Sequence, residues 1–324
     1  MDQVKDRPLD LTEALFFPYA IKRRKRVIDE NIRFVHYTSA EAGIAIIKSK
    51  SIRLRNSSVM NDFSEVQHGI ECLKSAYYGE EGRRLNALLD SVHSGTSQRV
   101  EEILEALMQH QLESSFLVSI GEHGDNYVDE DRYGRLSMWR AYGGDINVAF
   151  VFNNKPFTTP SDALGAYTSP VFYADADAFN VEFRSFISNF EANAAIIKNI
   201  PQDSVIDHLL NAMHFAVLST KHPGFSEERE WRVIHSPTIW HSEVLKPSIE
   251  IIGGLPQRVF SLPMANIPEK NFTGAEIPEL LDRVIIGPTQ YPRPVAEAFI
   301  ETLGDAGVPN AKDRVFVSDI PLRR

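Results

Sequence analysis

The segment Glu227-Glu228-Arg229-Glu230-Trp231-Arg232 holds the densest set of side chains able to do chemistry. If it forms a β-strand, Glu228, Glu230 and Arg232 stand in one row, with neighbours about 6.5–7 Å apart. A carboxylate fixed on a strand at the rim of a cleft can stabilise positive charge or accept a proton. Such a row is more often an exposed salt-bridge ladder, and the segment alone does not decide between the two.

A second candidate is His36-Tyr37-Thr38, at the end of a stretch rich in aromatic and β-branched residues. In a strand, Phe34 and His36 share one face, and Val35 and Tyr37 share the other. A histidine in this place is either a satisfied residue at the edge of the core or a group that contacts a ligand. Its ring can donate to and accept from a sugar hydroxyl.

Two further segments combine aromatic or polar side chains with turn residues. In Ser137–Gly143, Trp139 and Tyr142 share a helical face, Arg140 can meet a phosphate, and Gly143-Gly144 permits close approach of a ligand. An aromatic pair at this spacing is more commonly part of the core. In Met60–Glu65, Asn61 and Asp62 are candidate ligand contacts, although a helix cap is the commoner role.

Several established motifs are missing from the sequence. There is no HExxH and no GxSxG, and Gly287-Pro288-Thr289 lacks the spacing of a phosphate loop. His68 and Cys72 supply two potential zinc ligands where three or four are needed. Because Cys72 is the single cysteine, an internal disulfide is excluded. We expect no metal.

The elements that position these residues alternate between strands and helical blocks. We expect a helical lead-in over residues 1–30 and a single domain over 31–324, with helical insertions at about 65–113 and 177–219. The polar stretch 121–135 is expected to be a mobile loop. The fold class is α+β, with a mixed or antiparallel β core. Strands are expected at 32–38, 51–55, 115–120, 147–152, 171–173, 228–234, 283–288 and 314–318, and shorter helices at 40–48 and 295–303.

Bulk properties narrow the class of protein. The chain has 324 residues, 43% of them hydrophobic, a net charge of −10 and a pI near 5.5. It has no signal-like start and no apolar run of about 20 residues, so we expect a cytoplasmic protein without a membrane span. Contact with nucleic acid would have to be local. The basic run Lys22–Arg26 is interpreted as a solvated helix face rather than a phosphate site.

Five signatures in a fixed order resemble the bacterial domain of unknown function 2971 family. They span roughly residues 32–290 and are His36-Tyr37-Thr38, Met60-Asn61-Asp62–Glu65, Ser137-Met138-Trp139–Tyr142-Gly143, Lys221–Phe225–Glu230-Trp231-Arg232, and Ile285-Ile286-Gly287-Pro288. More distantly, the layout resembles the ADP-ribosyltransferase superfamily. That resemblance implies an ADP-ribosyltransferase-like β core and NAD as the substrate. It assigns the catalytic carboxylate to Glu230, with Glu228 completing a paired-Glu pattern.

The same resemblance implies how NAD is held. His36 would bind a ribose hydroxyl, and Tyr142 or Trp139 would stack on nicotinamide. The remaining cofactor contacts would come from Tyr37, Thr38, Asn61, Asp62, Arg140 and Arg232. The expected activity is ADP-ribosyl transfer to a nucleic acid or protein, or NAD hydrolysis, in a toxin or antiviral defence setting. Two alternatives stay open: a non-catalytic module that senses a nucleotide or nucleic acid, and a metal-dependent nuclease using Asp62, Glu65 and Glu230.

Overall fold

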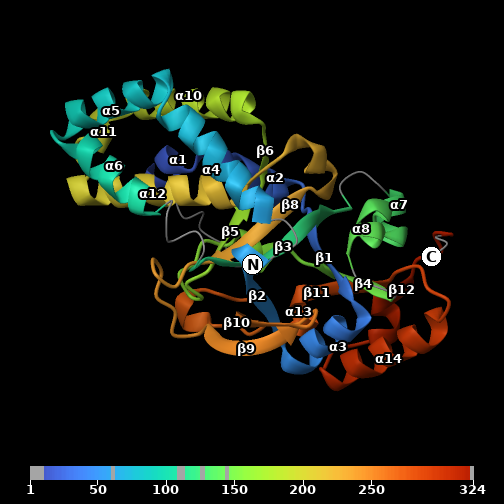
Figure 1. Cartoon of the computed structure of the whole chain (residues 1–324). Coiled ribbons are helices and arrows are strands. Elements are labelled where there is room, and N and C mark those ends of the chain that lie inside the picture. The colour runs from blue at the N-terminus through green and yellow to red at the C-terminus, as the bar shows by residue number, and fades with distance from the viewer. Residues whose placement is uncertain (1–10, 60–62, 108–113, 125–127, 143–145, 322–324) are drawn as a thin grey trace. The chain divides into compact units, whose positions relative to one another are not determined.

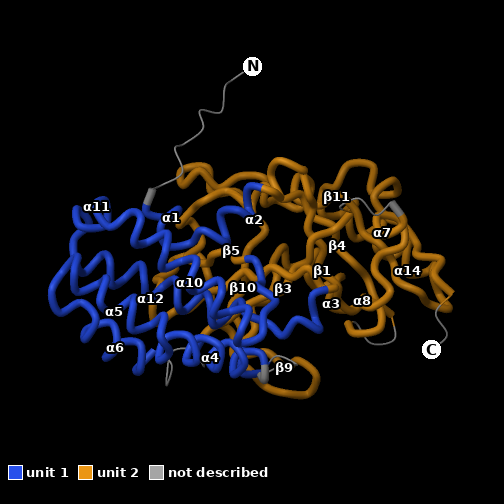
Figure 2. The backbone as a smooth tube through the Cα atoms, turned by 90° about the horizontal axis from the view of Figure 1, so that it is seen from above, with its two compact units in different colours: residues 1–25, 57–114, 170–226 blue, residues 26–56, 115–169, 227–324 orange. Residues whose placement is uncertain are grey.

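The computed structural model describes residues 11–59, 63–107, 114–124, 128–142 and 146–321. The chain divides into two compact units, each assembled from three separate segments (Figure 2). Unit 1 contains Met1–Lys25, Ser57–Ser114 and Pro170–Ser226. Unit 2 contains Arg26–Asn56, Ser115–Ser169 and Glu227–Arg324.

Unit 2 is built on a mixed, mostly antiparallel sheet, in agreement with the expected α+β class (Figure 1). Among the described residues the sheet has ten strands; the β11–β12 pair is parallel, and the other pairs along the main path are antiparallel. The main path runs β12 (Val315–Val317), β11 (Leu281–Ile286), β4 (Asn147–Phe152), β1 (Arg33–Ser39), β3 (Phe116–His123), β2 (Ser51–Asn56), β10 (Leu255–Pro263) and β9 (Lys246–Ile252). Off this path, β8 (Glu230–His235) pairs with β3 and with β5 (Tyr167–Pro170).

Strand β3 is the point at which the sheet branches. β8 pairs with it continuously over Phe116–Gly121 and so occupies one of its edges. β1 pairs with Gly121–His123 and β2 with Phe116–Leu117, so both lie on the other edge, at opposite ends. Between them, residues 118–120 of β3 have no strand partner on that edge among the described residues. The split in the sheet therefore lies beside Ser119.

Helix α3 (Ala40–Ser49) links β1 to β2 and begins where the sequence predicts it. Ser39 is the N-cap, and its hydroxyl accepts a hydrogen bond from the Ala42 N–H at 3.2 Å. Helix α14 (Pro292–Asp305) packs beside α3 on the core of this unit. Gly43 permits the close approach, because a Cβ there would lie 2.9 Å from Val148 and 3.1 Å from Phe299. The large apolar core between these elements includes Val148, Phe150, Leu54, Ile286 and Leu303.

Unit 1 is helical, and six of its described helices come from the two segments expected to be insertions. They are α4 (Phe63–Tyr77), α5 (Glu80–Val92), α6 (Thr96–Ala106), α10 (Ala176–Ala192), α11 (Ala194–Ile197) and α12 (Gln202–Leu218). The lead-in provides α1 (Leu11–Phe16) and α2 (Pro18–Asp29), with the last residues of α2 in unit 2. A small parallel pair, β6 (Phe172–Tyr173) with β7 (Thr220–Lys221), and the 3₁₀ helix η4 (Pro223–Glu228) complete this part of the chain.

The expected mobile loop at 121–135 is wrong over most of its described length. β3 continues to His123, and α7 (Val128–Tyr133) is followed by α8 (Leu136–Ala141). Glu130 and Asp131 of α7 are paired with arginines distant in sequence, which local polarity cannot reveal. Ile103 is also an exception to its apolar stripe, because it is 40% exposed while Val100 is fully buried.

Smaller elements complete the description. Helix α9 (Lys155–Thr158) follows β4, α13 (Ile277–Leu280) precedes β11, and short 3₁₀ turns lie at Ser57–Val59, Pro268–Lys270 and Ala311–Arg314. The basic run at Lys22–Arg26, expected to be a solvated helix face, is only partly exposed and is partly neutralised. Arg24 pairs with Glu13 at 2.6 Å, and Arg26 pairs with Glu30 at 3.3 Å.

Candidate functional site

Glu230 is a buried carboxylate at the start of β8. Only 6% of the residue is exposed. The Ser119 hydroxyl donates to its Oε1 at 2.5 Å, and Arg232 donates from Nε to Oε1 at 2.8 Å and from Nη2 to Oε2 at 3.4 Å. Ser119 is opposite Arg232 in the β3–β8 register, so all three side chains belong to one face of the sheet. Three hydrogen bonds from two neighbours therefore fix the orientation of the carboxylate.

The expected row of acidic residues is only partly present. Glu230 and Arg232 share a strand face as the alternation predicts, but Glu228 ends the 3₁₀ helix η4 instead of lying in the strand. Arg229 has φ +48°, and this left-handed residue breaks the alternation before β8 begins. The commoner alternative, an exposed salt-bridge ladder, is also wrong, because Arg232 is only 3% exposed.

His36 contacts the same residue of β3 that holds Glu230. Its Nδ1 lies 3.0 Å from the Ser119 carbonyl oxygen. Because a carbonyl only accepts, Nδ1 carries the proton, and Nε2 of the neutral ring is then an acceptor. Burial lowers the pKa of His36, with the Ser119 hydrogen bond acting in the opposite direction, so the ring is neutral near pH 7.

His36 and Glu230 approach Ser119 from different sides. The register pairs Val35 with Gly121 and Gly121 with Glu230, so Val35 and Glu230 share a face and His36, one residue along, starts from the other. Ser119 lies in the split where β1 and β2 diverge, and there its main chain meets His36 while its side chain meets Glu230. Ser119 thus connects two residues that are far apart in sequence.

Arg135 fixes the chain that leads into β8. It is 7% exposed, and its Nη1 donates to the carbonyls of Glu227 and Glu228 at 2.7 and 2.9 Å. Its Nη2 donates to the Glu122 carbonyl and to the Glu130 carboxylate at 2.8 and 2.7 Å. One guanidinium therefore ties the approach to Glu230 to both β3 and α7.

Of the three aromatic candidates, two are buried in the core and one is partly exposed. Trp139 is 1% exposed, donates from Nε1 to the Tyr133 carbonyl, and meets Tyr37 edge-to-face at 4.8 Å. Tyr37 is buried, its hydroxyl accepts the Arg135 N–H, and burial raises its pKa to about 12. Both residues have their surfaces occupied by the core. Tyr142 packs against the same cluster but is half-buried, with its hydroxyl 3.4 Å from a Glu228 oxygen, so it is the most exposed of the three aromatic candidates.

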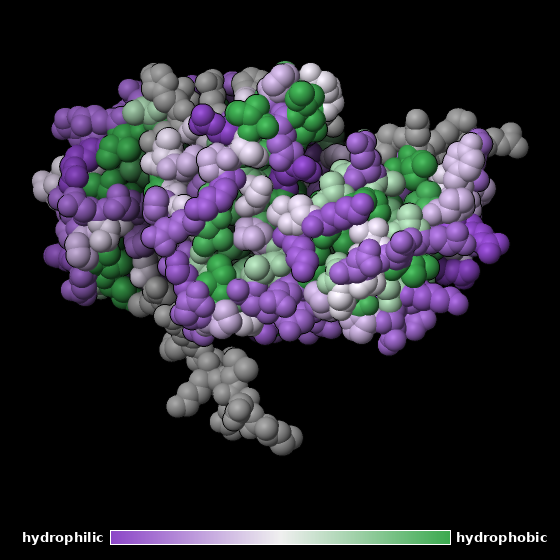
Figure 3. All heavy atoms as spheres, turned by 90° about the horizontal axis from the view of Figure 1, so that it is seen from below, coloured by the Kyte–Doolittle hydropathy of each residue, from purple (hydrophilic) through white to green (hydrophobic). Residues whose placement is uncertain are grey.

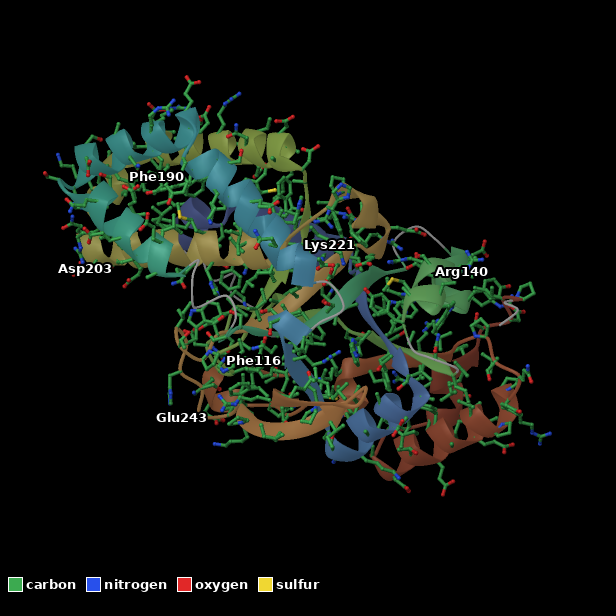
Figure 4. The ribbon with its side chains drawn as sticks, in the orientation of Figure 1. Phe116, Arg140, Phe190, Asp203, Lys221 and Glu243 are labelled. Atoms are coloured by element: carbon green, nitrogen blue, oxygen red, sulfur yellow. The ribbon has the colours of Figure 1, made fainter. Side chains whose placement is uncertain are left out.

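The other residues that were expected to contact a ligand do not, where the structure describes them, lie together around Glu230. Thr38 is half-buried on β1, and Arg140 is exposed on α8 (Figure 4). Asn61 and Asp62 lie outside the described residues. Glu65 belongs to unit 1, where its carboxylate forms a buried 2.6 Å ion pair with Lys221.

Two residues of the site are not identified by any sequence motif. Ser119 sits in the apolar run 115–120, where a lone polar residue between Val118 and Ile120 is the one available signal. Arg135 ends the polar stretch 121–135, whose composition is typical of a solvated loop. Its importance depends on carbonyl groups more than 90 residues away, which local patterns do not report.

The α7 residues Glu130 and Asp131 form ion pairs with arginines from other parts of the chain. Asp131 pairs with Arg33 at 2.5 Å and with Arg283 at 3.2 Å, and Glu130 pairs with Arg229. The nearby His123, together with Arg33 and Arg283, holds the pKa of Asp131 well below its usual range. Within the described ranges, no cluster of three or more histidine, cysteine or acidic residues has the arrangement of a metal site. No helix in those ranges is long and apolar enough to cross a bilayer.

Comparison with known proteins gives one match. The model of a family described as "Protein of unknown function (DUF2971)" matches residues 138–233, which include Trp139, Glu230 and Arg232. The match supports the resemblance to that family over this part of the chain, and its description names no activity. No curated protein and no solved structure matches the chain.

Proposed function

We propose that the chain is an NAD-consuming enzyme that breaks the bond between nicotinamide and ribose. ADP-ribose would pass to a nucleic acid or protein acceptor, or to water. The observation that supports this most strongly is the buried Glu230 carboxylate, oriented on a strand by Ser119 and Arg232 and connected through Ser119 to a neutral histidine. Cleavage of such a glycosidic bond builds positive charge on the ribose carbon, and a pre-oriented carboxylate stabilises that charge.

In this proposal His36 holds the ribose. With its Nδ1 proton donated to Ser119, Nε2 is left as an acceptor for a ribose hydroxyl. A neutral ring is required, since imidazolium has no acceptor, and burial favours the neutral form. His36 reaches Ser119 from the face opposite Glu230, so the proposal requires the ribose to lie in the split beside Ser119, where a hydroxyl bound to His36 would position the reacting carbon relative to Glu230.

Tyr142 and Arg140 would bind the two ends of the nicotinamide mononucleotide half. The half-buried ring of Tyr142 offers a face for the departing nicotinamide, and the exposed guanidinium of Arg140 offers donors to the pyrophosphate. Glu228, whose carboxylate is next to the Tyr142 hydroxyl, would draw the proton from an incoming acceptor. Arg232 acts by holding Glu230, so we assign it a positioning role.

The test is the release of free nicotinamide from NAD, with and without nucleic acid and protein acceptors. Wild-type protein should release nicotinamide, and Glu230→Gln should lower the rate by about a hundredfold or more, as expected when an electrostatic group is removed. The matched control is Glu243→Gln, an exposed glutamate of the same unit, which should retain the wild-type rate.

Other outcomes would identify a different function. Binding of NAD without turnover, unchanged by any acceptor, would favour a sensing module. Magnesium-dependent cutting of nucleic acid, with NAD untouched, would favour a nuclease. If NAD neither binds nor is consumed by the wild-type protein, the proposal is withdrawn.

A further inference from the structure

Strands β9 and β10 form a tight hairpin whose turn fixes the direction of every backbone group in β9. The two-residue loop is Gly253-Gly254, with φ of +59° and +82°, and Ile252 pairs with Leu255 across it. Positive φ at both positions is typical of a type I′ turn, whose flanking residues form a hydrogen-bonded pair. Even-numbered residues of β9 therefore direct their N–H and C=O groups at β10. Ile249 and Ile251 direct theirs at the opposite edge, as Pro247 does with its carbonyl alone.

That outer edge is open and apolar. β9 ends the main path of the sheet, and no described strand pairs with its other side. Ile249 and Ile251 are 70% and 74% exposed, more than any other large apolar residue described, and Pro256 and Arg258 opposite them are also exposed. Figure 3 views the molecule from below, the side on which Figure 1 draws β9, and shows hydrophobic side chains among hydrophilic ones. Proteins usually protect such an edge.

We propose that a second copy of this chain covers the edge, with the two β9 strands antiparallel about a two-fold axis at Ile249. In this register the two Ile249 residues exchange both of their backbone hydrogen bonds. The Ile251 N–H of each copy donates to the Pro247 carbonyl of the other. Pro247 has no N–H to return, so the ladder stops at that residue on each side.

When two β9 strands pair about the axis at Ile249, their side chains also complement one another. On the outer face Ile249 meets Ile249 of the second copy, and Ile251 meets Pro247, so the four isoleucines form a continuous apolar strip. On the other face Ser248 is opposite Glu250, and Lys246 is diagonal to Glu250, which is already held within each chain by Arg53. The charges are therefore complementary. A two-fold axis uses each edge once, so the assembly closes as a dimer instead of extending into a fibre.

The first test is sedimentation of the full chain over a concentration series. We expect the mass to rise from the 36.6 kDa monomer to twice that value as concentration increases. Ile249→Pro removes the central outward N–H at an edge position where proline is tolerated, and should raise the dimer dissociation constant about tenfold or more. Val181→Lys, at an apolar site on α10 that is 63% exposed, should leave the constant unchanged.

A crosslinking experiment tests the register. Two cysteines introduced by Ile249→Cys would have Cα atoms about 5.5 Å apart across the axis, within the range of a disulfide. Cysteines from Arg258→Cys would be three strand spacings apart, about 15 Å, and should not crosslink. Oxidation should therefore give a covalent dimer with Ile249→Cys alone. A wild-type chain that is monomeric at every concentration, or equal crosslinking by both variants, would overturn the proposal.

Discussion

At the scale of single residues, Ser119 contacts both His36 and Glu230. Its carbonyl accepts from His36 and its hydroxyl donates to Glu230, so one residue in the split of the sheet aligns both. A serine in a buried strand leaves a polar hydroxyl that needs a partner, and Glu230 is that partner. Main-chain and side-chain contacts at one position make the relative placement of the two groups depend on β3 rather than on a loop.

Substitutions of Ser119 should distinguish its effect on the orientation of Glu230 from any effect on NAD binding. If the proposed function holds, Ser119→Ala should lower kcat about tenfold with little change in KM, because Glu230 stays but loses one of its orienting donors. Ser119→Thr retains the hydroxyl and should recover most of the rate. Steady-state nicotinamide release gives both constants. Equal losses of kcat in the alanine and threonine variants would show that the hydroxyl does not act through Glu230.

His214, fully buried on α12, should make stability depend on pH. Burial lowers its pKa to about 4, whereas an unfolded histidine titrates near 6.5. Below that value the unfolded chain binds the proton and the folded chain does not. Stability is therefore lost as pH falls from about 6.5 towards 4, at up to about 1.4 kcal/mol per pH unit. The low pKa of His36 and of His235 acts in the same direction.

Urea unfolding at pH 8 and pH 5 measures this contribution. The free energy of unfolding of His214→Leu should fall between these pH values by about 2 kcal/mol less than that of the wild type. The comparison is between pH values within each protein, so a constant cost of the substitution cancels. Identical pH dependence in both proteins would mean that His214 binds its proton in the folded state as readily as in the unfolded state.

At the scale of elements, the α7–α8 segment depends on Arg135. Its guanidinium joins α7, β3 and the approach to β8, so Arg135→Leu would leave the buried Glu130 without one of its cationic partners. We expect a loss of about 3–5 kcal/mol in the free energy of unfolding. Arg135→Lys should recover only part, because an ammonium cannot reproduce the planar fork. Arg132→Leu, in α7 and with its side chain 67% exposed, is the control and should change stability by less than about 0.5 kcal/mol.

Several elements were predictable because their signals are local. The strand at 33–39 has a β-branched and aromatic pattern, Ser39 caps the next helix, and β4 is a continuous apolar run bounded by asparagines. The hairpin of β9 and β10 was also within reach. Two apolar runs separated by Gly253-Gly254 are a strong hairpin signal, and the expected elements do not include it.

What could not be predicted depends on contacts distant in sequence. The acidic residues of α7 resemble a solvated loop until Arg33, Arg229 and Arg283 are placed beside them. The left-handed Arg229, which moves Glu228 out of the strand, has no local signature. Of the expected site, Glu230 and Arg232 lie on one sheet face with the Ser119 side chain, and His36 contacts the Ser119 carbonyl from the other face. Tyr37 and Trp139 pack in the core because their rings fill space between the sheet and α8.

At the scale of the molecule, the chain leaves the sheet-containing unit twice. The first departure follows β2 and the second follows β5, and each returns after a helical segment that belongs to unit 1. These two segments of unit 1 are Ser57–Ser114 and Pro170–Ser226. That the whole chain behaves as a single domain stays a prediction. All residues assigned here to catalysis belong to unit 2, so the proposed chemistry is a property of the sheet-containing unit.

In the proposed function, Glu230 stabilises the positive charge that forms when the bond between nicotinamide and ribose breaks. NAD binding and nicotinamide release should be measured side by side for the wild type and for Glu230→Gln. We expect both proteins to bind NAD with similar affinity, and Glu230→Gln to release nicotinamide about a hundredfold or more slowly than the wild type. A Glu230→Gln protein that turns over NAD at the wild-type rate would contradict this role of Glu230.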